Sequence, residues 1–193
     1  MRFRLAALIL VAGLEVSAFG QGMASRATAS TKIEGKQVAI DYGQPALKGR
    51  NFANLIKQLP QDRMWRAGSG AVTTLSTDAD LLIGGKRVPA GKYSIYIHCP
   101  DTGNYSLVLN SDLGQPLSKI WSAAPPNQAN EPYPHFEYTK EIGTREVVRA
   151  ALTKITVPET DLLTYAFNPS GSGAGLTISW GTQAWSLKIQ TAK

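Results

Sequence analysis

Residues 65–110 constrain the fold more than any other part of the chain. In the run KYSIYIHC (residues 92–99), side chains alternate: Tyr93, Ile95, Ile97 and Cys99 share one face, and Ser94, Tyr96 and His98 share the other. Gly84-Gly85 and residues 89–91 mark tight turns before this run, and residues 101–104 mark a turn after it. A period of two between tight turns predicts antiparallel strands with one buried face.

The rest of the chain repeats this pattern and contains one helix signal. Strand-like runs occupy residues 31–42, 136–139, 146–157, 162–167, 176–180 and 185–190. Apolar residues recur at helical spacing over residues 51–59, where Asn51 is placed to cap a helix and Pro60 to end it. We predict an all-β protein, a single β-sandwich or jelly-roll-like domain of about ten short strands with one short helix near residues 51–59.

The first twenty residues have the plan of a secretory signal peptide. Arg2 and Arg4 precede an apolar core over residues 5–14, and Ala18 and Gly20 place small side chains at −3 and −1 of a cleavage point before Gln21. The core is shorter than the ~20 residues of a membrane span, so cleavage is favoured over a retained anchor. We expect residues 1–20 to be removed, residues 21–30 to form a flexible lead-in and residues 31–193 to form the domain. The expected location is periplasmic or secreted, with no membrane span after removal of the signal.

Charge and residue usage exclude several classes of function. The formal net charge of +6 is modest and no run of Lys and Arg occurs, so a nucleic-acid partner is not expected. A single cysteine leaves no internal disulfide to form. With only two histidines and no HxH or HxxxH spacing, the sequence predicts no metal site and no cofactor.

No catalytic residue stands out. His98 and Cys99 are adjacent, but neighbours on a strand point to opposite faces, so they are not expected to form a nucleophilic pair. No GxSxG motif is present. The carboxylates that remain offer many pairs among which the sequence does not choose: Asp41, Asp62, Asp80, Asp101, Glu131 and Glu137. Whether the protein is an enzyme stays open, and the sequence leans against it.

Two groups of residues are candidates for ligand binding. The first would form a cationic and aromatic surface for an anionic or sugar ligand, if its segments meet in space: Tyr42, Lys48, Arg50, Trp65 and Arg66. The favoured alternative is structural, with Arg50 or Arg66 paired to Asp41, Asp62 or Asp80 and Trp65 filling the end of the core.

The second candidate group lies in the loop over residues 122–135, which contains four prolines. It comprises Glu131, Tyr133 and His135. Long loops on a rigid β scaffold often carry binding residues, although an inert connection explains the composition equally well.

Six short motifs recur here in the order and spacing of a known family. They are DYGQPALKGR (41–50), WRAG (65–68), TTL (73–75), IGGKRVPAGKYSIY (83–96), LVLN followed by GQ (107–115) and SWG (179–181). The pattern resembles the DUF2911 family, exported bacterial proteins of unknown function. The resemblance implies a β-rich domain at the cell envelope or outside the cell and supplies no catalytic residue. Where the family usually carries Asn-Glu, this chain has Gly70-Ala71, so an activity built on that carboxylate is not expected here.

The sequence therefore favours a non-catalytic binding or envelope-associated module, whose ligand would be an anionic or sugar component of the envelope. One alternative is a hydrolase acting on envelope carbohydrate or peptide through carboxylates not yet identified. A second alternative is an interaction module that docks a protein through an edge strand or the 122–135 loop.

Overall fold

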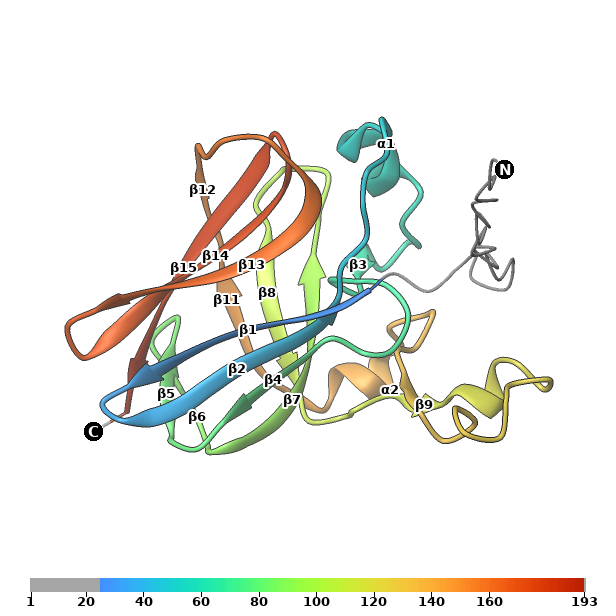
Figure 1. The fold of residues 1–193 in the computed structure, drawn as a ribbon, viewed down its shortest axis with the longest axis horizontal. Helices are drawn as coiled ribbons and strands as arrows, with labels where there is room; N and C mark the ends of the chain where they lie inside the picture. The colour runs from blue at the N-terminus through green and yellow to red at the C-terminus, as the bar shows by residue number, and fades with distance from the viewer. Residues whose placement is uncertain (1–24, 193) are drawn as a thin grey trace, which may run out of the picture.

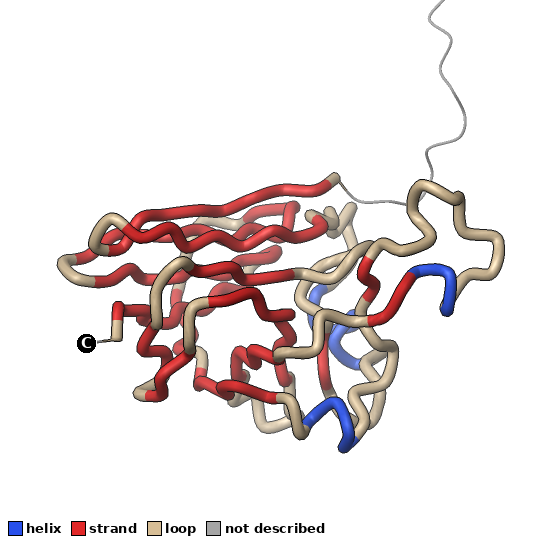
Figure 2. The backbone as a smooth tube through the Cα atoms, turned by 90° about the horizontal axis from the view of Figure 1, so that it is seen from below, coloured by secondary structure: helices blue, strands red, loops and turns tan. Residues whose placement is uncertain are grey.

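A computed structural model of the chain describes residues 25–192. The expected signal peptide over residues 1–20 and the first part of the expected lead-in lie outside these residues. Two antiparallel sheets face each other across a shared core. Figure 1 shows both sheets, with the segment that contains a separate two-stranded pair (residues 115–116 and 132–133) to one side. Figure 2 shows the helices and longer loops gathered toward one end of the molecule. The predicted all-β fold is confirmed.

The first sheet has the order β1-β2-β4-β7-β8-β11, and the short strand β3 also pairs with β7. Its strands are β1 (Arg26–Ile33), β2 (Lys36–Gly43), β3 (Met64–Trp65), β4 (Thr74–Thr77), β7 (Gly91–His98), β8 (Ser106–Asn110) and β11 (Glu146–Ala151). Residues 26–30 belong to β1, so the prediction of a flexible lead-in is wrong for this stretch. β1 pairs with β2 along its whole length, and Ala27 and Ala29 pack against the core.

The second sheet has the order β13-β14-β15-β5-β6, and β12 also pairs with β15. Its strands are β5 (Leu81–Ile83), β6 (Lys86–Val88), β12 (Thr153–Ile155), β13 (Thr160–Ser170), β14 (Gly173–Gly181) and β15 (Gln183–Thr191). The run from residue 65 to residue 110 thus visits both sheets, because β5 and β6 form a hairpin on the second sheet between β4 and β7 of the first.

The core lies between the sheets and follows the alternation seen in the sequence. Ile95 and Ile97 of β7 are fully buried in it, together with Cys99. His98 lies outside this cluster and is partly exposed, so the prediction that His98 and Cys99 point to opposite faces is confirmed. Residues of both sheets contribute to one continuous cluster, which runs from Ile33 to Ile189.

The helix predicted over residues 51–59 is confirmed in a shorter form, as α1 (Phe52–Lys57). The side chain of Asn51 caps it by accepting a hydrogen bond from the N–H of Ala53 at 2.8 Å. Phe52 packs against three tryptophans at one end of the sandwich, and this end cluster comprises Phe52, Trp65, Trp180 and Trp185. A helix of this length is stable only when docked, and the end cluster provides the docking.

Residues 111–145 form a covering segment that leaves the first sheet after β8 and returns at β11. It contains β9 (Gln115–Pro116), η1 (Leu117–Lys119), β10 (Pro132–Tyr133) and α2 (Lys140–Gly143). Tyr138 of this segment packs on Met64, Tyr96 and Val108, a small apolar cluster separate from the main core. The strand predicted at residues 136–139 is wrong, since the N–H of Tyr138 donates to the carboxylate of Asp62 at 2.6 Å instead of to a neighbouring strand. Across residues 25–192, no helix is long and apolar enough to span a membrane.

Candidate functional site

Two of the five residues in the first candidate group are parts of the core. Tyr42 is 3% exposed and its ring meets that of Tyr165 edge to face, with centroids 4.6 Å apart. Trp65 is 8% exposed and stacks on Trp180 at 5.6 Å, in the end cluster. The alternative interpretation, in which Trp65 fills the end of the core, describes its position correctly.

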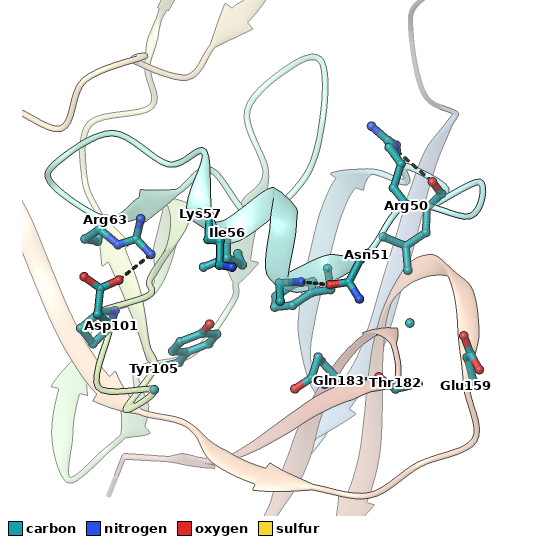
Figure 3. A pocket seen from close by; sticks show the side chains of 16 residues that line it. Arg50, Asn51, Ile56, Lys57, Arg63, Asp101, Tyr105, Glu159, Thr182 and Gln183 are labelled. Carbon is teal, nitrogen blue, oxygen red and sulfur yellow. Dashed lines mark hydrogen bonds and ion pairs between the residues drawn. The ribbon is translucent and has the colours of Figure 1, made fainter.

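Lys48 and Arg50 lie near α1 and are engaged in local contacts. Lys48 adopts a positive φ of 51°, and its backbone N–H donates to the carboxylate of Asp161 at 2.8 Å. Arg50 donates from Nε to the carbonyl of Leu47 at 2.9 Å and from a terminal nitrogen to that of Ala46 at 2.7 Å. Figure 3 shows the Arg50 guanidinium turned away from the side chains around the neighbouring cavity. The predicted single cationic and aromatic surface therefore does not form.

The salt bridges proposed as the structural alternative are also different from those expected. Asp41 pairs with Arg26, and Asp80 pairs with Arg87 at 2.6 Å. Asp62 accepts the backbone N–H groups of Met64 and Tyr138, at 2.9 and 2.6 Å. Within the described chain, neither Arg50 nor Arg66 forms a salt bridge.

Arg66 instead lies over the ring of Tyr133, a residue of the second candidate group. Because Trp65 faces the core, its neighbour Arg66 points to the outer face of the first sheet. The guanidinium carbon of Arg66 lies 5.6 Å from the ring centroid of Tyr133 and 5.9 Å from that of Phe136. These distances are within the range of cation–π attraction. One residue of the first group is thereby joined to the loop of the second.

A cavity of about 180 Å³ opens beside this guanidinium, and we call it the Arg66 pocket. Its walls are mainly apolar and aromatic, with a few polar groups. Met64 and Tyr96 lie on strands of the first sheet, and Arg66 directly follows β3. The covering segment supplies the residues from 135 onward, so the pocket lies between these two layers. The full lining comprises Leu59, Pro60, Asp62, Met64, Trp65, Arg66, Tyr96, His135, Phe136 and Tyr138.

Two buried polar atoms of the lining residues have no hydrogen-bond partner among the described residues. They are Nη1 of Arg66 and the hydroxyl oxygen of Tyr96. An unsatisfied buried polar group costs about 1–3 kcal/mol, and more when it is charged. Such groups are rare in native structures and call for an explanation, of which a missing ligand is one.

Burial raises the pKa of Tyr96 to about 12, and the carboxylate of Asp112 adds to this effect. The N–H of His135 and the charge of Arg66 act in the opposite direction, although the geometry between His135 and the Tyr96 oxygen is too poor for a hydrogen bond. At neutral pH the tyrosine is therefore a hydroxyl that can donate a hydrogen bond. Two side chains that line one small cavity thus each carry a buried polar atom without a partner among the described residues, a guanidinium nitrogen and a tyrosine hydroxyl.

Two carboxylates lie near Arg66 in the Arg66 pocket or beside it, and both are engaged in hydrogen bonds. Asp62 lines the pocket and accepts the two backbone N–H groups described above. Asp112 accepts from Arg145 at 2.7 Å and from the N–H of Gly114 at 2.7 Å, and lies 3.2 Å from Nε2 of His135. Burial opposes ionisation of Asp112, but these hydrogen bonds and charges leave its pKa below the ordinary value. The carboxylate of Glu131 forms no salt bridge in residues 25–192. Among the described residues, no carboxylate forms a salt bridge with Arg66, although Asp62 lines the same pocket.

A second and larger cavity of about 500 Å³ lies at the end of the sandwich, beneath α1, and we call it the end groove. Three segments enclose it: α1, the turn before Tyr105, and the turn between β14 and β15 at residues 181–183. Figure 3 shows Arg63 reaching Asp101 on one side of the groove and Glu159 on the other side. The Arg63–Asp101 pair is 3.0 Å long.

The titratable groups of residues 25–192 show which acid–base and metal chemistry the described side chains can supply. Among residues 25–192, no three His, Cys, Asp or Glu side chains gather as metal ligands. Burial raises the pKa of the Cys99 thiol to about 12, so the thiolate needed for nucleophilic attack is disfavoured. The two carboxyl groups with shifted pKa values, Asp80 and Asp112, are both shifted downward. A general acid would require the opposite direction.

The sequence reasoning missed Tyr96, Phe136 and Tyr138. Tyr96 did carry a signal, because it is a large aromatic residue on the face of β7 that otherwise holds Ser94 and His98. Its position implies that something covers that face. Nothing in the sequence identifies residues 136–138 as the cover.

Comparison with known proteins gives a family and no nearer relative. A family model described as a protein of unknown function (DUF2911) matches residues 24–189, which is nearly the whole chain. Neither the curated proteins nor the solved structures gave a match.

Proposed function

Because the chain belongs to the DUF2911 family, whose function is unknown, we infer its function from the Arg66 pocket. We propose that the protein is a non-catalytic module that binds a small anion in this pocket. One observation carries this proposal: Nη1 of Arg66 and the hydroxyl of Tyr96 are both buried and unpartnered beside one cavity. An anion accepting from both would satisfy them together.

The chemistry of the pocket favours a carboxylate with a compact apolar body. A guanidinium presents its N–H groups in a planar fork that matches the oxygens of a carboxylate, and such charged hydrogen bonds are stronger than neutral ones. The walls formed by Met64, Phe136 and Tyr138 suit an apolar group. A volume of about 180 Å³ is below the roughly 300–1,000 Å³ of pockets for drug-sized ligands, so the ligand is a small acid or the acidic end of a larger molecule.

The aromatic rings around Arg66 prepare it for this role. Tyr133 and Phe136 hold the guanidinium by cation–π attraction, which leaves its N–H groups free for an acceptor. A side chain fixed before binding loses less entropy when the ligand arrives. The signal peptide expected over residues 1–20 would place this pocket outside the cytoplasm, where the ligand would come from the cell envelope or the medium.

The proposal is tested by thermal unfolding and calorimetry with acetate, benzoate, phosphate and sulfate as probes. A ligand at a hundredfold its Kd adds about 2.7 kcal/mol to the stability of the folded state, which raises Tm by several degrees. We expect benzoate to give the largest shift and Arg66→Gln to abolish it. Tyr96→Phe should weaken binding by about tenfold to a hundredfold, since a hydrogen bond to a charged group contributes roughly 1.5–3 kcal/mol.

Arg87→Gln is the matched control, because Arg87 is exposed, pairs with Asp80 and lies outside the pocket. It should bind the probes as the unaltered protein does. An equal response to benzoate in Arg66→Gln, or no response to any of the four anions in the unaltered protein, contradicts the proposal.

A further inference from the structure

The end groove has the size and the construction of a ligand site. Its volume of about 500 Å³ falls within the roughly 300–1,000 Å³ typical of small-molecule pockets. Its walls come from α1 and from turns that connect strands in both sheets, at the end of the sandwich where loops of distant sequence meet. Binding residues concentrate on such loops because the sheets hold them in place.

Parts of the wall are held in fixed and locally strained conformations. Arg63 adopts a positive φ of 54°, which is unfavourable for a residue with a side chain. Its N–H donates to the carbonyl of Pro60 at 2.9 Å and its carbonyl accepts from Cys99 at 2.8 Å, so hydrogen bonds on both sides maintain this conformation. Backbone strain of this kind, of the order of 1–3 kcal/mol, concentrates at functional sites.

The charges around the end groove largely cancel or are already used. Arg63 pairs with Asp101 and also donates to the carbonyl of Cys99 at 3.3 Å. Arg50 is bound to two carbonyls and is turned away (Figure 3). Lys57 and Glu159 remain, and they have opposite signs. In contrast to the Arg66 pocket, this groove does not select for an anion.

The uncharged part of the lining combines apolar residues, among them Phe52 and Ile56, with the side chains of Asn51, Tyr105, Thr182 and Gln183, which can form hydrogen bonds. Within residues 25–192, the side chain of Gln183 forms one hydrogen bond, from Nε2 to the hydroxyl of Thr182 at 3.3 Å. The oxygen of Asn51 caps α1, and in the described chain its NH₂ donates to no residue. The ring of Tyr105 stacks on Trp185 at 5.2 Å and its hydroxyl end points toward α1 (Figure 3).

We infer that the end groove binds a neutral saccharide. Sugars present closely spaced hydroxyl groups that both donate and accept, which matches amides and hydroxyls at Asn51, Thr182 and Gln183. Their C–H faces pack on aromatic rings, which Tyr105 provides. This site is separate from the Arg66 pocket, and the inference does not depend on the proposed anion.

Calorimetry and ligand-observed NMR test the inference, with glucose, galactose, N-acetylglucosamine and their di- and trisaccharides as probes. We expect at least one saccharide to bind, with oligomers binding more tightly than monomers. Gln183→Ala should lower the affinity tenfold or more. Gln58→Ala is the matched control, since Gln58 follows α1, is exposed and does not line the groove.

The variants also separate the two sites. Arg66→Gln should leave saccharide binding unchanged, and Gln183→Ala should leave the response to benzoate unchanged. Unfolding curves of each variant verify that the fold is intact. The inference is overturned if no saccharide of the panel binds, if Gln183→Ala binds as the unaltered protein does, or if benzoate or sulfate competes with the saccharide.

Discussion

The end cluster and the Arg66 pocket are both rich in aromatic rings, yet the first is a packed cluster and the second borders a cavity. Trp65 belongs to the end cluster and also lines the pocket, whereas its neighbour Arg66 belongs to the pocket alone. In the end cluster every ring is buried, and Nε1 of Trp180 donates to the carbonyl of Asp161 at 3.1 Å. In the Arg66 pocket, Phe136 is 57% exposed and two buried polar atoms are unpartnered. Satisfied polar groups distinguish a packing cluster from a binding site more clearly than aromatic content does.

The largest expected difference between the two regions is in stability. Trp65→Ala removes a buried ring between Phe52 and Trp180, and we expect the free energy of unfolding to fall by about 3–5 kcal/mol. Phe136→Ala changes an exposed ring, and we expect a change within about 0.5 kcal/mol. Urea unfolding of both variants measures the two values. Similar losses in both would mean that the Arg66 pocket is also a packing cluster.

Removing the hydroxyl group from each of two buried tyrosines should change the free energy of unfolding by a smaller amount, and in different directions. The hydroxyl of Tyr165 donates to the carbonyl of Ala67 at 2.7 Å, whereas that of Tyr96 has no partner. Tyr165→Phe should therefore cost about 1 kcal/mol, and Tyr96→Phe should leave stability unchanged or raise it by up to about 1 kcal/mol. Urea unfolding of both variants measures these changes in the free energy of unfolding. A loss at Tyr96 equal to that at Tyr165 would show that Tyr96 is satisfied in the folded protein.

The smallest expected effect is a dependence on acid. The folded-state pKa of Asp112 lies below its ordinary value of 3.8, because its hydrogen bonds and the charges of His135 and Arg145 outweigh burial. Its stabilising contribution is therefore present above pH 4 and is lost as the pH falls through the lowered pKa. Asp112→Asn should lose less stability than the unaltered protein between pH 5 and pH 2, by an amount of about 1 kcal/mol or less.

The control for this pH series is Phe52→Leu. Phe52 and its partners in the end cluster carry no titratable group, so this variant should show the pH dependence of the unaltered protein. Urea midpoints at several pH values test both. A slope in Asp112→Asn as steep as in the unaltered protein would exclude Asp112 as the source.

Local patterns were sufficient to predict much of the fold. Alternation along residues 92–99 identified the buried face of β7, and Asn51 with Pro60 bracketed α1, because capping and termination depend on a few neighbouring residues. The lead-in at residues 26–30 was wrong because small polar residues form a strand once β2 offers a partner. The strand at residues 136–139 was wrong because Asp62, distant in sequence, binds the backbone there. Such contacts leave no local trace.

The sequence identified several residues of the Arg66 pocket and its surroundings, but not that they lie together. Arg66, Tyr133 and His135 were identified, but in two separate groups, and Arg66 was assigned to one surface with Trp65. Strand alternation already argues against that assignment, since adjacent residues face opposite sides. The unpartnered state of Arg66 was not predictable, because it depends on which groups the fold brings near and which of them are already engaged.

The covering segment has a consequence for how this protein diversifies. Tyr96 lies on β7 and Arg66 directly follows β3, whereas His135, Phe136 and Tyr138 belong to a detour between β8 and β11, which pair directly with each other. Substitutions, insertions and deletions in the detour can change the cavity while the sandwich keeps its strand pairing. In the proposed site, the charged group and several residues that shape the cavity thus lie on different parts of the chain. A change in the detour would alter which ligand fits without removing the arginine.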